Sequence, residues 1–138
     1  MADLKDKIKA EFDNIDRLFD EMPALQNLPH LSTLELAGVA TLLHNFYNGI
    51  ENIIKQILYS MNVTHSAGGS WHRELLNSAV SRSIISDGLR VQLGQYLAFR
   101  HFISHSYALD IYPKRIEPLL KNAKRIYDEF KIEIEAFI

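Results

Sequence analysis

An eight-residue segment, RHFISHSY, combines side chains suited to chemistry on phosphate esters. Arg100 is always charged, and the rings of His101 and His105 exchange protons near neutral pH. A guanidinium offers forked donors to phosphate oxygens, and an imidazole can move the protons of a ribose 2′-hydroxyl and a leaving 5′-oxygen. Ser104 and Tyr107 add hydroxyl groups that can bond to phosphate. These residue types predict RNA cleavage without a metal, leaving a 2′,3′-cyclic phosphate.

The spacing of the segment limits how its residues can meet. In an ideal helix of about 100° per residue, Arg100, Ser104 and Tyr107 share one face, whereas His105 is rotated by roughly 140° from Arg100. Three arrangements bring arginine and histidine together. The helix loosens near its end, the long arginine side chain bends around, or the two residues come from different subunits.

Other roles for the same residues remain open. The two histidines lie at the helical spacing i, i+4 and could hold a divalent metal, with His72, Glu51 or Asp110 completing the set. A histidine at a helix end is often a capping residue, and an arginine there can neutralise the helix dipole. No HExxH motif, phosphate-binding glycine loop or dinucleotide fingerprint is present, so we expect neither a metal nor a cofactor.

The elements that must position this segment are predicted to be helices throughout. Apolar residues recur at helical spacing and no alternating strand pattern competes with them. We expect one all-α domain over residues 1–138, an up-and-down bundle of four to five helices. The first helix is predicted from residue 4 to Pro23, a linker runs through Pro29, and Ser32 or Thr33 caps the second helix with Glu35 in a capping box. A flexible connection at Ala67–Ser70 leads to a short helix that opens at Trp71, with His72 as a local cap. Asp87 is expected to cap the helix that carries RHFISHSY, and the last helix starts at Pro113, with Pro118 delaying or kinking its first turns.

Composition narrows the class of protein. Hydrophobic residues make up 47% of the chain, enough for a core. The absence of cysteine excludes disulfides and agrees with the cytoplasm, and the charged N-terminus predicts neither a signal peptide nor a membrane span. Residues 71–125 carry nine Lys and Arg against four Asp and Glu, although the whole chain has a net charge of −2. This basic block suits an anionic partner such as RNA or a nucleotide, but it is also typical of a solvated helix face.

Three segments together resemble one known family. Residues 46–54 (FYNGIENII), 71–76 (WHRELL) and 100–107 look like successive parts of a HepT-like subgroup of the HEPN superfamily, whose signature is an arginine, four residues and a histidine. The resemblance implies an all-helical homodimer in which both copies of the motif line one cleft. It assigns the active-site arginine and histidine to Arg100 and His105, with His101 at a usually polar position.

The resemblance also implies a partner and a modification. Toxins of this kind are paired with a nucleotidyltransferase antitoxin, which can attach AMP to the tyrosine that corresponds to Tyr107. Glu51 lies in an apolar helix stripe, where it could pair with Arg100, orient a histidine or stay at the surface. We therefore expect the endoribonuclease toxin of such a pair. The alternative is a non-catalytic nucleotide-binding or scaffolding partner of the nucleotidyltransferase, since the fold alone does not guarantee cleavage.

Overall fold

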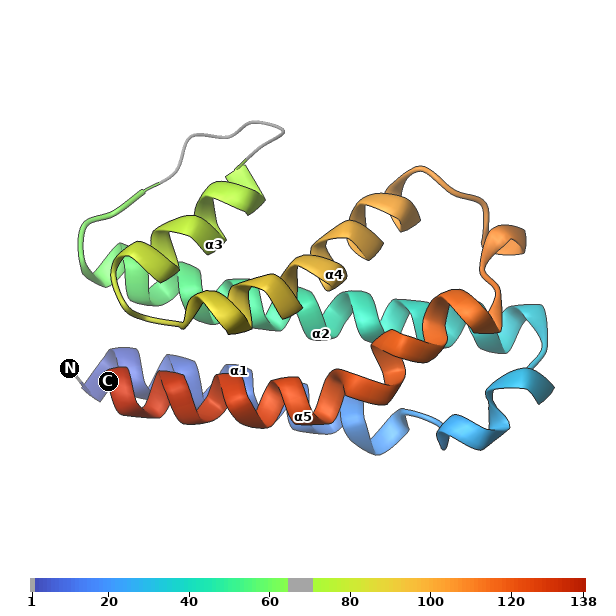
Figure 1. Cartoon of the computed structure of the whole chain (residues 1–138). Helices are drawn as coiled ribbons and strands as arrows, with labels where there is room; N and C mark the ends of the chain where they lie inside the picture. Colours follow the sequence, from blue (N-terminus) through green and yellow to red (C-terminus); the bar gives the residue numbers. More distant parts are fainter. Residues whose placement is uncertain (1, 65–70) are drawn as a thin grey trace.

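The computed structural model describes residues 2–64 and 71–138, and no residue in these two ranges belongs to a β-strand (Figure 1). The expected flexible connection at 67–70 lies outside the described residues. The prediction of an all-α bundle is confirmed. The elements are α1 (Ala2–Glu21), the 3-10 helix η1 (Leu25–His30), α2 (Thr33–Ser60), α3 (Trp71–Ser81), α4 (Asp87–Ser104), the 3-10 helix η2 (Ala108–Asp110) and α5 (Pro113–Phe137).

The four long helices, α1, α2, α4 and α5, alternate in direction along the chain, and α2 lies at the centre of the arrangement. Figure 1 shows α1 and α5 side by side on one side of α2, while α3 and α4 form an antiparallel pair on the other. Hydrophobic residues of all five α-helices join one buried cluster, in which Phe46, Tyr47 and Ile50 of α2 are fully buried. No helix among the described residues is both long and apolar enough to cross a membrane.

Helix starts follow local chemistry, with one correction. Ser32 caps α2 in a complete capping box, because its hydroxyl accepts from the Glu35 amide and the Glu35 carboxylate accepts from the Ser32 amide. The prediction that Asp87 caps α4 is wrong. Ser86 is the N-cap and its hydroxyl accepts from the Leu89 amide, while Asp87 is the first helical residue and pairs with Arg90.

The prolines act differently from one another. Pro29 lies inside η1, so the expected linker is a 3-10 helix. Pro113 begins α5, where its missing amide hydrogen costs nothing. Pro118 does not delay α5, which is continuous through it, but Figure 1 shows the first turns of α5 running at an angle to the rest.

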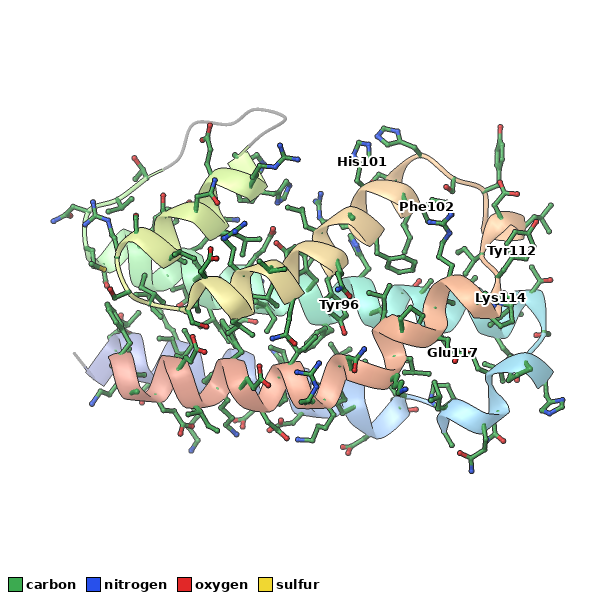
Figure 2. All side chains as sticks on the ribbon, in the orientation of Figure 1. Tyr96, His101, Phe102, Tyr112, Lys114 and Glu117 are labelled. Carbon is green, nitrogen blue, oxygen red and sulfur yellow. The ribbon has the colours of Figure 1, made fainter. Side chains whose placement is uncertain are left out.

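Buried tyrosines fix α4 and α1 to α5. The Tyr96 hydroxyl donates to the Leu119 carbonyl at 2.7 Å, and the Tyr127 hydroxyl bonds to the Phe12 carbonyl and to the Asp16 carboxylate. Figure 2 shows Tyr96 between α4 and α5. These bonds satisfy hydroxyl groups inside the core, and they hold the helix that carries the RHFISHSY segment.

Candidate functional site

The RHFISHSY segment straddles the end of α4. Arg100 to Ser104 form its last turn, and His105 is the C-cap residue, with its amide donating to the Phe102 and Ile103 carbonyls. The chain therefore leaves helical geometry at the point where an ideal helix would have rotated His105 away. Tyr107 is already extended, with φ −85° and ψ 152°, and its side chain is 81% exposed.

The two motif histidines contact each other. Their ring centroids lie 4.6 Å apart in an edge-to-face arrangement, and both side chains are exposed. Figure 2 shows His101 near the C-terminal end of α4, on the side away from α1 and α5. The Ser104 hydroxyl donates to the Arg100 carbonyl at 3.0 Å, which leaves its oxygen lone pairs as acceptors. The His101 and His105 rings form one exposed pair at the helix end.

A groove of about 720 Å³ separates α3 from α4. Arg100 and His101 line it from α4, and His72 lines it from α3. Arg73 and Arg90 add positive charge, and the described lining residues include no carboxylate, although Asp87 pairs with Arg90 from the side. We call this hollow the α3–α4 groove. Its size and charge suit part of a nucleic-acid strand or a nucleotide.

Glu51 is the buried acid of the described chain, with 3% of its surface exposed. Its two carboxylate oxygens lie 2.8 and 3.0 Å from Nδ1 of His72, whose side chain is 14% exposed. A buried carboxylate is stable only where it is paired, and the imidazole supplies that pairing. Of the three roles expected for Glu51, the structure supports the orienting of a histidine, since Glu51 bonds to His72. The prediction that His72 is a local cap is wrong, because its ring bonds to α2.

Two further residues of α2 share this polar cluster. Burial lowers the pKa of His44, the positive charge of Arg100 lowers it further, and Glu51 acts in the opposite direction. Burial raises the pKa of the Tyr47 hydroxyl far above its usual range, with the negative charge of Glu51 adding to the effect. Arg100 and Glu51 thus act on the same neighbours, His44 and Tyr47, so α2 contributes much of the electrostatic surroundings of Arg100.

Arg100 is half-buried, and its guanidinium forms no hydrogen bond or ion pair within residues 2–64 and 71–138. Its Nε lies out of reach of solvent without a partner there. A guanidinium remains charged in proteins, even where it is partly buried. Because the guanidinium of Arg100 lacks a partner among the described residues, it gives the α3–α4 groove a fixed cation that an anion can satisfy.

Sequence reasoning placed Glu51 and the RHFISHSY residues. It considered His72 only as a cap or a metal ligand, and it did not consider His44 at all. His44, Tyr47 and Glu51 lie at the helical spacing i, i+3, i+7, which places them on one side of α2. That polar series inside an apolar helix was the available signal. Within the part of the chain that is described, no three His, Asp or Glu side chains gather as a metal-binding group, so the alternative metal set does not assemble there.

Comparison with known families defines the class of this bundle. Residues 38–138 match the family model of HepT-like proteins, and this region holds most of α2 and everything after it. The chain belongs to the HepT-like family, a branch of the HEPN superfamily. No curated protein and no solved structure matches the chain significantly.

Proposed function

We propose that this protein is a metal-independent endoribonuclease, the toxin of a toxin–antitoxin pair that acts in the cytoplasm. The observation that carries the proposal is the position of Arg100, which lines a basic groove together with His101 and lacks a partner among the described residues. Membership of the HepT-like family supports the same class of function. RNA is the substrate because the ribose supplies the attacking 2′-hydroxyl.

Each residue of the segment has a defined part in the proposal. Arg100 binds the phosphate and stabilises the extra negative charge of the pentacoordinate transition state. His105 is the general acid/base, and His101, whose ring contacts it, assists in moving protons. Tyr107 contributes its hydroxyl to the phosphate, and Ser104 can donate to it once its hydroxyl turns away from the Arg100 carbonyl.

We further propose that the active form is a homodimer. The rings of His101 and His105 are exposed at the end of α4, so a second copy can approach them. Two motif copies in one cleft would place His105 of one subunit near Arg100 of the other, which relaxes the geometric limit of a single helix.

The test uses purified protein and total cellular RNA in the presence of EDTA. Wild type should cleave, and the new ends should be 2′,3′-cyclic phosphates. Arg100→Lys keeps the charge but loses the fork, and His105→Asn loses the titrating ring, so each should lower the rate by about 100-fold or more. His30→Asn, at an exposed histidine in η1, is the matched control. Equal rates for wild type and His105→Asn would contradict the assignment.

One observation favours a second function for the same surface. Tyr107 is 81% exposed just beyond α4, where a modifying enzyme can reach its hydroxyl. In this alternative the chain is a non-catalytic nucleotide-binding or scaffolding partner of a nucleotidyltransferase antitoxin, which transfers AMP to Tyr107. The added phosphate would also repel RNA, so the modification would shut off a ribonuclease.

Mass spectrometry can test the modification. The protein is incubated with ATP, Mg²⁺ and the nucleotidyltransferase encoded beside it, and peptides are searched for one added AMP. We expect the label on Tyr107 and none on Tyr107→Phe. Tyr112 and Tyr59 are also exposed and serve as internal controls. Labelling confined to either of them would contradict the assignment.

A further inference from the structure

The bond between Glu51 and His72 pairs a buried carboxylate and also determines which ring nitrogen of His72 carries the proton. Each carboxylate oxygen of Glu51 lies within 3.0 Å of Nδ1, so this nitrogen carries the proton and donates it to the carboxylate. The proton on Nδ1 leaves Nε2 as the free ring nitrogen when the imidazole is neutral. His72 is thereby held in the tautomer that can accept a proton at Nε2.

The ring of His72 is also held in place. The neighbouring Trp71 ring lies against it with centroids 3.7 Å apart, and the Lys55 ammonium lies 4.6 Å from the Trp71 ring centre. Only 14% of the His72 side chain is exposed, and His72 lines the α3–α4 groove. A fixed tautomer and a fixed ring orientation are what a positioned proton acceptor needs.

The groove brings this ring to the same space as the motif. His72 lines it from α3, and Arg100 and His101 line it from α4. His101 in turn contacts His105 at 4.6 Å between ring centroids. One chain therefore brings to this groove a phosphate-binding cation and His101 from α4 and an oriented imidazole from α3.

We propose that His72, positioned by Glu51, is a catalytic base that works opposite Arg100 on an RNA strand bound in the α3–α4 groove. This role rests on the ribonuclease function proposed above. The RHFISHSY segment does not contain His72, which lies on another helix. Glu51 acts through His72 and is a positioning residue.

The step balances with groups already in place. Nε2 of His72 takes the proton of the ribose 2′-hydroxyl, and the 2′-oxygen forms a bond to phosphorus. The bond from phosphorus to the 5′-oxygen breaks, and a protonated ring of the His101–His105 pair gives that oxygen a proton. Arg100 holds the phosphate throughout. The products are a 2′,3′-cyclic phosphate and a 5′-hydroxyl end.

The decisive variant is His72→Asn. The asparagine amide stands where Nδ1 stood, so it can still donate to Glu51 and keep the buried carboxylate paired, but it has no counterpart of Nε2. On a labelled oligoribonucleotide that carries a site mapped in total RNA, we expect kcat to fall by about 100-fold or more while KM changes little. His30→Asn is the matched control and should keep wild-type kinetics.

A second variant tests the positioning role. In Glu51→Gln the side-chain amide can donate to Nδ1, which moves the ring proton to Nε2 and removes the proton acceptor from the groove. We expect a lower kcat with KM little changed. Nitrogen-15 NMR of labelled histidine should find the proton of His72 on Nδ1 in wild type and on Nε2 in the variant. A purely structural role for Glu51 would not move this signal.

The outcomes separate the two proposals. If wild type cleaves RNA, Arg100→Lys and His105→Asn are inactive, and His72→Asn keeps the full kcat, the role of His72 is refuted and the ribonuclease stands. A His72 proton on Nε2 in wild type also refutes it. If wild type cuts no RNA in EDTA, the ribonuclease proposal itself is wrong and the catalytic role of His72 falls with it.

Discussion

A single buried carboxylate organises the residues of the site. Glu51 bonds to His72 and acts electrostatically on His44 and Tyr47, so the states of three side chains on two helices depend on one charge. A buried carboxylate such as Glu51 destabilises the fold unless its partner is present. Two predictions follow from its surroundings.

Removing the Glu51 carboxylate should destabilise the fold. Glu51→Ala leaves the His72 donor without its partner and opens a gap beneath it, which should lower the free energy of unfolding by about 2 to 4 kcal/mol. Urea denaturation at pH 7 measures the loss. The same substitution at Glu117, an exposed residue of α5, is the control and should change stability little. Similar losses in both variants would mean that the Glu51–His72 bond contributes nothing.

The lowered pKa of His44 predicts a pH dependence of stability. In the unfolded chain His44 takes up a proton as the pH falls through about 6.5, whereas the folded protein resists this because of burial and the charge of Arg100. Stability is therefore present above that pH and is lost as the pH falls toward the lowered value. Wild type should lose more stability than His44→Gln between pH 7 and pH 5, measured by urea denaturation at several pH values. Parallel curves would contradict the prediction.

At the scale of the helices, close packing of α1 on α2 sets the frame that α3 and α4 are built on. A β-carbon at Gly49 would lie 2.7 Å from Cγ1 of Ile15, closer than real contacts allow, so α1 crosses α2 at a point that requires glycine. Gly38, earlier in the same helix, has no atom within 4 Å of such a carbon. The two glycines make a matched pair.

Alanine at these positions should have opposite effects. Gly38→Ala should stabilise the protein by about 0.5 to 1 kcal/mol, because alanine has the higher helix propensity. Gly49→Ala gains the same propensity but forces Ile15 and α1 to shift, and overpacking of this kind typically costs about 1 to 3 kcal/mol. Thermal unfolding of both variants checks the difference. A Gly49→Ala protein as stable as Gly38→Ala would show that α1 moves away at no cost.

At the scale of the whole molecule, the proposed dimer decides whether a catalytic centre belongs to one chain or two. Arg100 is half-buried, whereas His105 is exposed beyond the end of α4, which suits a histidine that serves the neighbouring subunit. Mixing two inactive variants distinguishes the arrangements. If arginine and histidine come from different subunits, a mixed dimer of Arg100→Lys and His105→Asn regains one intact centre.

The expected recovery is quantitative. Random exchange of equal amounts makes half of the dimers mixed, each with one intact centre of two, so about one quarter of wild-type activity should return. Co-refolding of the two variants followed by the RNA cleavage assay measures it. If each centre uses one chain only, the mixture stays inactive, and each variant refolded alone is the baseline.

The sequence by itself determined the helices and the position of the motif. Apolar residues at helical spacing, the Ser32–Glu35 capping box and Pro113 are local signals, and the structure has each of them. The end of α4 was also readable, because the residues that stop a helix lie next to those that form it. Local signals failed where two residues competed for one role, as at Ser86 and Asp87, where the backbone angles of the turn made the choice.

Only the tertiary structure decided which polar groups meet. Glu51 and His72 are 21 residues apart on different helices, and their contact depends on how α3 packs on α2. The same holds for the α3–α4 groove that joins His72 to Arg100. The physical reason is that helix periodicity fixes only the face on which a side chain lies, whereas the crossing of two helices is set by the fit of their buried side chains, which no local pattern encodes.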